Sequence, residues 1–116
     1  MARWLTEAQV KKRVKKQLGE YTKRFWYMPG SSPFTTMDGQ PDIILVWKGV
    51  YIGIEVKGPK YRQSPEQRIF QKRLIDAGGI YLLVTSYNIH KFPFYLRLIR
   101  WMIGKKHAIW RSEKAV

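Results

Sequence analysis

Apolar residues near the N-terminus recur at the spacing of an α-helix. Within residues 6–21 they stand three or four positions apart, which predicts a helix with one apolar face made of Val10, Val14, Leu18 and Tyr21. Thr6 precedes this stripe and is a favourable residue for the N-cap of the helix. Glu7 lies three positions before Val10, so we expect its side chain on or near the face that packs inward.

The middle of the chain changes to the pattern of a β-hairpin. Residues 42–47 and 50–57 are apolar runs rich in β-branched and aromatic residues, and Lys48-Gly49 joins them. Lys-Gly is a weaker turn signal than Asn-Gly, but two-residue turns are the commonest hairpin connection. Such a turn would place Asp42 opposite Glu55, unless a bulge at Gly53 changes the register. The preceding segment, residues 27–41, is rich in Gly, Pro, Ser and Thr and predicts a loop.

A second helix and a further strand follow the hairpin. Ser64 fits an N-cap, Pro65 fits the first helical position, and Gly78-Gly79 fits the end of the helix. The run 80–85 predicts a buried strand, parallel to the strand 50–57 because a helix connects the two. The buried side of this helix is expected to consist of Ile69, Phe70, Leu74 and Ala77.

The C-terminal segment predicts a third helix, opened by Pro93. The helix would carry four large apolar residues, Phe94, Leu98, Trp101 and Met102. This is much apolar surface for a terminal segment, and it is consistent either with completion of the core or with a subunit interface.

Composition narrows the class of protein. The chain has 116 residues, of which 45% are hydrophobic and 15% aromatic, which indicates one folded α/β domain over residues 1–116. Cysteine is absent, which excludes disulfides and thiolate metal sites. No apolar run approaches the roughly 20 residues of a membrane span, and the N-terminus lacks the apolar core of a secretory signal. We therefore expect a cytoplasmic protein without a membrane partner.

The charge indicates a polyanionic partner. The chain contains 22 Lys and Arg residues against 8 Asp and Glu, a net charge of +14. These bases are spread along the chain rather than gathered in a tail, which favours nucleic acid over a membrane surface. The candidate DNA contacts are Lys11, Lys12 and Lys15 on the first helix and Lys60 and Arg62 after the hairpin. A charged run of this kind also occurs on an ordinary solvated helix face.

The acidic residues of the hairpin stand out against this background. Side chains alternate along a strand, so Asp42, Glu55 and Lys57 share one face, while Ile54 and its neighbours point to the other. Two facing carboxylates repel, and a fold keeps them where a cation lies between them. Lys57 is one such cation, but a hard divalent ion, Mg²⁺ or Mn²⁺, suits two oxygen ligands better. The alternative is a pair of surface acids with basic neighbours.

These residues resemble a known signature. Pro41-Asp42, followed by Glu55-Val56-Lys57, resembles the P-D…(D/E)-x-K motif of restriction-endonuclease-like nucleases. The wider segments GQPDIIL, GIEVKGPK, SPEQ and AGGIYLLVTS resemble the virus-type replication-repair nuclease (VRR-NUC) domain. The resemblance covers about residues 5–86 and leaves 87–116 unmatched. It implies a restriction-endonuclease-like core, with a mixed central sheet and flanking helices in the order αβββαβ.

The resemblance also implies roles for individual residues. Asp42 and Glu55 would bind Mg²⁺ or Mn²⁺ together with Glu7 and the backbone carbonyl of Val56. Lys57 would be the catalytic lysine. Gln67 matches a glutamine that these nucleases place beside the active site, although Ser64-x-x-Gln67 is also a capping box.

The function implied is that of a metal-dependent DNA endonuclease. The resemblance points to a structure-selective enzyme that cuts branched DNA, such as a four-way Holliday junction, as a homodimer. A nuclease acting on flaps or on linear duplex is one alternative. A non-catalytic basic domain that only binds nucleic acid is another, and salt-sensitive binding without metal dependence would identify it.

Overall fold

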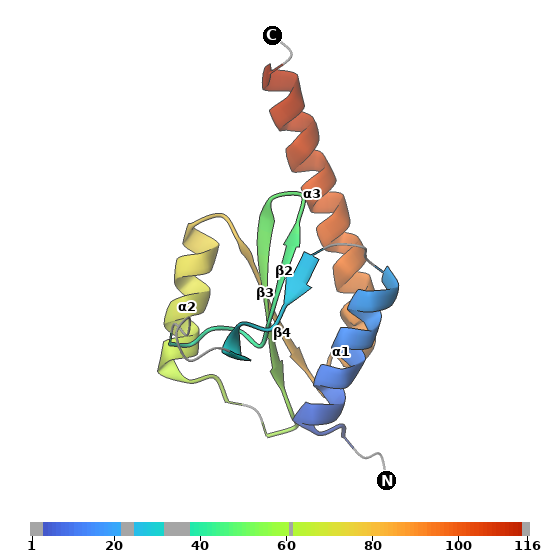
Figure 1. Cartoon of the computed structure of the whole chain (residues 1–116), viewed down its shortest axis with the longest axis vertical. Helices are drawn as coiled ribbons and strands as arrows, with labels where there is room; N and C mark the ends of the chain where they lie inside the picture. Colours follow the sequence, from blue (N-terminus) through green and yellow to red (C-terminus); the bar gives the residue numbers. More distant parts are fainter. Residues whose placement is uncertain (1–3, 22–24, 32–37, 61, 115–116) are drawn as a thin grey trace.

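The structure is a computed structural model, and it describes residues 4–21, 25–31, 38–60 and 62–114. Within these residues lie three α-helices, four β-strands and two short 3₁₀ turns, and the strands form one sheet in the order β1-β2-β3-β4 (Figure 1). The elements are α1 (Glu7–Tyr21), β1 (Phe25–Tyr27), η1 (Pro29–Ser31), β2 (Ile43–Trp47), β3 (Val50–Lys57), α2 (Pro65–Asp76), β4 (Ile80–Thr85), η2 (Ile89–Lys91) and α3 (Phe92–Lys114). The chain therefore has an α/β fold, and its elements from α1 to β4 follow the predicted αβββαβ order.

The β2–β3 hairpin has the predicted register. Lys48 and Gly49 have φ angles of 49° and 80°, so both central residues of the turn adopt the positive φ that a type I′ turn requires. Ile43 pairs with Ile54 and Ile44 pairs with Gly53 in one unbroken antiparallel ladder. Gly53 therefore does not form a bulge.

The two outer strands differ in how well the sequence predicts them. β4 runs parallel to β3, as expected for two strands joined by a helix. β1 pairs antiparallel with β2; the αβββαβ order implied a strand before the hairpin, but no pattern of residues located it. A strand of three residues is too short to show a period of two, and its last residue, Tyr27, was assigned to the loop 27–41. Residues 32–37 of that loop lie outside the described residues.

One face of the sheet carries the hydrophobic core. Helices α1 and α3 cover this face (Figure 1). The predicted stripe of α1 is confirmed at Val10, Val14 and Leu18, which are fully buried. They pack with alternate residues of the strands, Ile43, Leu45, Ile52, Ile54, Val56 and Val84 among them. Thr6 caps α1 as expected, because its hydroxyl accepts the Gln9 N–H at 3.2 Å.

Helix α2 lies over the opposite face and packs loosely. Its N-terminus matches the prediction, since Ser64 and Gln67 form a capping box with Pro65 at the first helical turn. The predicted buried side is wrong in part: α2 has no buried residue, Ile69 is 59% exposed and Ala77 is exposed. The physical reason is that α2 does not close against the hairpin along its whole length, and a cavity remains between them.

Helix α3 confirms the predicted C-terminal helix, but the four apolar residues singled out from the sequence are not the ones that enter the core. Its buried residues are Phe92, Leu96, Ile99 and Ile103, which complete the core. The residues singled out from the sequence, Phe94, Leu98, Trp101 and Met102, are between 44% and 58% exposed. The end of α3 extends beyond the sheet (Figure 1). In the part of the chain that the structure describes, no helix is both long enough and apolar enough to cross a membrane.

Candidate active site

Asp42 and Glu55 meet at the end of the sheet where β2 begins and β3 ends. Asp42 directly precedes β2, and the ladder places it opposite Glu55, because Ile43 pairs with Ile54. Glu55 lies on the face of β3 that α2 covers, while Ile54 and Val56 point into the core on the other face. The predicted juxtaposition of the two carboxylates is therefore confirmed.

Asp42 is held by several partners. Its Oδ2 accepts the Val56 N–H at 2.8 Å, and its Oδ1 lies 3.2 Å from Nζ of Lys11. Burial alone would raise the pKa of Asp42. The interactions with Glu55, Val56 and Lys11 outweigh burial and lower the pKa below its ordinary value. These interactions therefore favour the ionised form of Asp42.

Glu55 has the opposite environment. It is only 2% exposed, and none of the described donors hydrogen-bonds its Oε2. Burial and the neighbouring Asp42 carboxylate raise the pKa of Glu55 from 4.5 to about 9, despite the charge of Lys57. The two acids therefore share a proton at neutral pH unless a cation takes its place. A buried carboxylate oxygen without a donor, facing a second carboxylate, fits a hard divalent cation.

Two lysines flank the acid pair. Nζ of Lys57 lies 3.8 Å from Oε1 of Glu55, so the predicted Asp42–Glu55–Lys57 set comes together. Lys11 was expected on the DNA-contact surface, and the structure instead directs its ammonium to Asp42. No local pattern of residues predicts this contact, because it depends on how α1 crosses the end of β2.

Glu7 does not lie as deep as expected. It is exposed in the first turn of α1, not on the buried stripe, because Val10, Val14 and Leu18 define that stripe. Its backbone lies close to Gly58, where an added Cβ would be 3.0 Å from the Glu7 nitrogen. The charge of Glu7 still contributes to the raised pKa of Glu55. Across the described ranges no three Asp, Glu or His side chains form one metal-binding group, so a role for Glu7 as a ligand stays a prediction.

Gln67 serves first as a cap. Its Oε1 accepts the Ser64 N–H at 2.9 Å, and its own N–H donates to the Ser64 hydroxyl at 3.1 Å. Both halves of the predicted capping box are therefore present. A place for Gln67 at the acid pair stays a prediction.

Three other polar residues lie near the acids and were not identified from the sequence. Nε2 of Gln63 donates to Oε1 of Gln71 at 2.9 Å and to the Tyr81 hydroxyl at 3.2 Å. Burial and the negative charges of Glu55 and Asp42 raise the pKa of Tyr81 to about 12, which outweighs the effect of Gln63. The available signal was the period of two in β4, which puts Tyr81 and Glu55 on the same face of the sheet.

The remaining candidate DNA contacts lie at the surface. Lys12, Lys60 and Arg62 are exposed, and Lys15 is half-buried. Lys60 and Arg62 follow the end of β3, so they lie close in sequence to Lys57. Contact of these side chains with DNA stays a prediction.

No protein-family model matches the chain, and a search of curated proteins finds no match. The resemblance to VRR-NUC nucleases therefore rests on the residues quoted above. The geometry of the acid pair carries the functional argument.

Proposed function

We propose that the chain is a metal-dependent DNA endonuclease of the VRR-NUC type within the restriction-endonuclease-like superfamily. The observation that carries the proposal is the buried acid pair. Glu55 presents a carboxylate oxygen without a donor beside the anionic Asp42, at the open end of a hairpin. Two carboxylates held this close are kept together by a shared proton in the metal-free protein, and a divalent cation can replace that proton.

The residues at the site divide the chemistry among them. Asp42 and Glu55 would hold Mg²⁺ or Mn²⁺, with the Val56 carbonyl and Glu7 as further candidate ligands. The metal supplies a bound water of lowered pKa and neutralises charge on the scissile phosphate. Lys57, 3.8 Å from Glu55, orients the attacking water or stabilises the negative charge that develops on the phosphate.

Lys11 provides a cation while the metal is absent. Its ion pair with Asp42 offsets the carboxylate, and a metal bound at Asp42 would take over that role. The released ammonium would then be free to contact a phosphate of the substrate. Lys11 therefore retains a proposed role in DNA binding, at the active site rather than on the outer surface of α1.

Branched DNA, such as a four-way junction, is the proposed substrate. The net charge of +14 supports contact with a phosphate backbone, and the spread of bases favours recognition of shape over sequence. A homodimer would place two such sites on symmetry-related strands. The exposed apolar residues of α3, Phe94, Leu98 and Trp101, support a subunit interface.

Cleavage of a labelled four-way junction tests the proposal. Asp42→Asn, Glu55→Gln and Lys57→Ala should each lower the rate of cleavage in Mg²⁺ by at least about 10²-fold, because each removes a group that acts in the transition state. Junction binding in Ca²⁺ should persist. Asp76→Asn is the matched control, since Asp76 is an exposed acid on α2 that does not line the cavity beside that helix, and its rate should match that of the wild type.

Two results would contradict the proposal. If Asp42→Asn cleaved the junction as fast as the wild type, the acid pair would not take part in the reaction. Absence of cleavage by the wild type on junction, flap and linear duplex, combined with salt-sensitive binding that all variants retain, would favour the non-catalytic binding domain. Light scattering tests the dimer separately, because a strict monomer that makes unpaired nicks would contradict junction resolution.

A further inference from the structure

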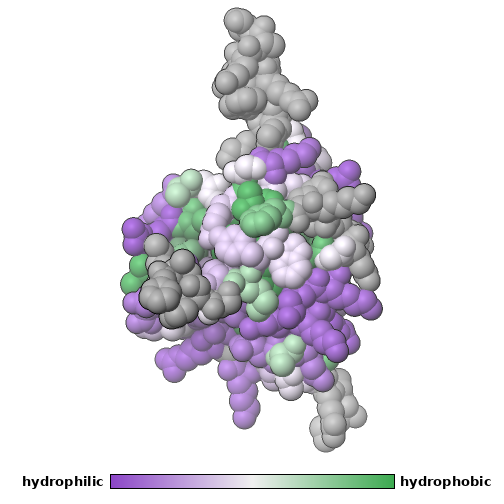
Figure 2. Space-filling view, in the orientation of Figure 1, coloured by the Kyte–Doolittle hydropathy of each residue, from purple (hydrophilic) through white to green (hydrophobic). Residues whose placement is uncertain are grey.

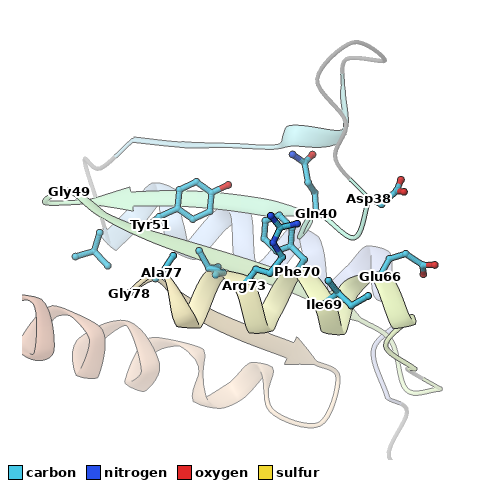
Figure 3. A pocket seen from close by; sticks show the side chains of 13 residues that line it. Asp38, Gln40, Gly49, Tyr51, Glu66, Ile69, Phe70, Arg73, Ala77 and Gly78 are labelled. Carbon is cyan, nitrogen blue, oxygen red and sulfur yellow. The ribbon is translucent and has the colours of Figure 1, made fainter.

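A cavity of about 820 Å³ opens between α2 and the β2–β3 hairpin, apart from the acid pair. This volume lies within the range of pockets that bind small organic groups. Figure 3 shows Phe70 and Arg73 directed from α2 toward the strands, with Tyr51 on the strand facing them. Asp38 and Glu66 lie together near the N-terminal end of α2 (Figure 3).

The lining combines apolar surface with hydrogen-bond acceptors. Tyr51 and Phe70 contribute rings, and Ile69 contributes an aliphatic side chain that is 59% exposed. Oε1 of Gln40 is buried, and no donor among the described residues reaches it. A pocket that combines aromatic rings with a buried amide acceptor is complementary to a nucleobase, whose face stacks on rings and whose exocyclic amino group donates to an amide or carboxylate.

Further aromatic residues lie on the same face of the sheet as this cavity. Phe25 and Tyr27 of β1 have ring centroids 5.6 Å apart and are 67% and 40% exposed. The strand pairings put them on the same face of the sheet as Tyr51. Figure 2 shows weakly polar and hydrophobic residues gathered over the middle of the sheet, between hydrophilic surfaces on both sides. Such a row suits successive unpaired bases, which stack on aromatic side chains without regard to sequence.

The cavity and the acid pair lie on one face of β3. Tyr51 precedes Glu55 by four residues, a distance of about 13 Å along a strand. Gly53 lies between Tyr51 and Glu55 on this face, and the side chains of Pro41 and Leu74 cover it. A Cβ added at Gly53 would lie 2.9 Å from Pro41 and 3.2 Å from Leu74. A base in the cavity therefore belongs to a nucleotide roughly two to four positions from the phosphate at the acid pair.

We propose that this pocket binds an unpaired nucleobase that carries an exocyclic amino group. The inference rests on the proposed function, since it takes the DNA substrate as the partner. The base is held by stacking against Tyr51 and Phe70 and by donation of its amino group to Gln40. The pocket thereby favours DNA with unpaired nucleotides next to the cut over continuous duplex.

Metal-free binding to a short fluorescent oligodeoxycytidine tests the pocket, with a fully paired duplex as the reference ligand. Ile69→Glu places a charge at the pocket, while Ile75→Glu makes the same change at an exposed isoleucine of α2 outside the lining. We expect Ile69→Glu to weaken oligonucleotide binding about tenfold and to leave duplex binding within about twofold. Ile75→Glu should change neither affinity by more than about twofold.

A second variant tests the acceptor. Gln40→Leu preserves size but removes Oε1, so it should abolish a preference of about fivefold for oligodeoxycytidine over oligothymidine, since thymine has no amino group. Equal affinity of the wild type for the two oligonucleotides would overturn the role of Gln40. The proposed base-binding role of the pocket would be overturned if Ile69→Glu and Ile75→Glu weakened oligonucleotide binding equally. It would also be overturned if the wild type bound no oligonucleotide.

The result is separable from the nuclease proposal because no metal and no cleavage enter the measurement. Binding that depends on Ile69 in a chain that never cuts DNA would support the pocket and contradict the nuclease. Junction cleavage by a chain whose oligonucleotide binding is indifferent to Ile69→Glu would support the nuclease and contradict the pocket.

Discussion

The two faces of the sheet differ in packing and in chemistry. The face under α1 and α3 buries aliphatic and aromatic residues from both helices and three strands, and sixteen of the described residues form its core. The face under α2 carries Glu55, Tyr51 and Tyr81, and its helix buries no residue completely. The first face supplies most of the stability, and the second face holds the acids and the cavity.

This difference shows how a small chain can keep a costly acid pair. A buried carboxylate without a donor destabilises the fold. The dense core on the opposite face of the same strands offsets that cost. Ile54 and Val56, on either side of Glu55 in the sequence, are fully buried in that core and hold β3 in place. The strand that holds the site is thus the strand most firmly held by the core.

The largest expected effect is on the free energy of unfolding, and it should differ between two phenylalanines on α3. Phe92 is fully buried and Phe94 is 54% exposed, although they stand two residues apart. Phe92→Ala should lower the free energy of unfolding by about 3–5 kcal/mol, because it leaves a cavity in the core. At protein concentrations low enough to keep the chain monomeric, Phe94→Ala should lower it by less than about 0.5 kcal/mol. Urea unfolding measures both, and similar losses would contradict the assignment of stability to the α1/α3 face.

A smaller effect should follow the protonation of Glu55. Its pKa is raised from 4.5 to about 9, so between these pH values the folded protein holds a proton that the unfolded chain has released. The stability of the metal-free protein should therefore be highest at the acid end of this window and fall as the pH rises through it. In the middle of this window the fall should approach about 1.4 kcal/mol per pH unit, the linkage value for one proton.

Glu55→Gln isolates this effect. Glutamine does not titrate, so the variant should lose less stability than the wild type between about pH 5 and pH 9. Glu66→Gln provides the control, since Glu66 is exposed. Stability profiles of wild type and Glu55→Gln that run parallel across this window would show that Glu55 is not protonated in the folded state.

The smallest expected effect on stability comes from removing the N-cap side chains of α1 and α2. Ser64→Ala and Thr6→Ala each remove a hydroxyl that accepts a backbone N–H, at a cost of about 1 kcal/mol. In α1 the loss should appear as lower global stability, because that helix is locked into the core. In α2 it should appear as faster amide exchange within the helix, because α2 is held loosely. The same global loss from both variants would contradict the contrast between the faces.

Local patterns predicted the hairpin and the acid pair well. A two-residue turn and alternation along two strands were sufficient to place Asp42 opposite Glu55 and Lys57 beside it. These relations involve neighbouring strands whose spacing is fixed by geometry. The caps Thr6 and Ser64 were equally local, so their positions were also correct.

Relations between distant elements were not accessible in this way. Lys11 reaches Asp42 because of the angle at which α1 crosses the sheet, which no local pattern encodes. The exposed Ile69 was assigned to a buried side because the helical pattern of α2 does not reveal that a cavity separates it from the hairpin. The choice between core and interface for Phe94, Leu98, Trp101 and Met102 was likewise left open by the sequence, because α3 is apolar around more than one face.

The central claim is that Asp42 and Glu55 form a divalent-cation site, and calorimetric titration of Mn²⁺ into the metal-free protein tests it most directly. The account predicts that the wild type binds Mn²⁺, that Asp42→Asn and Glu55→Gln abolish this binding, and that Lys57→Ala retains it, because Lys57 is not a ligand. Mn²⁺ binding that Glu55→Gln leaves unchanged, or a wild type that binds no Mn²⁺, would contradict the account.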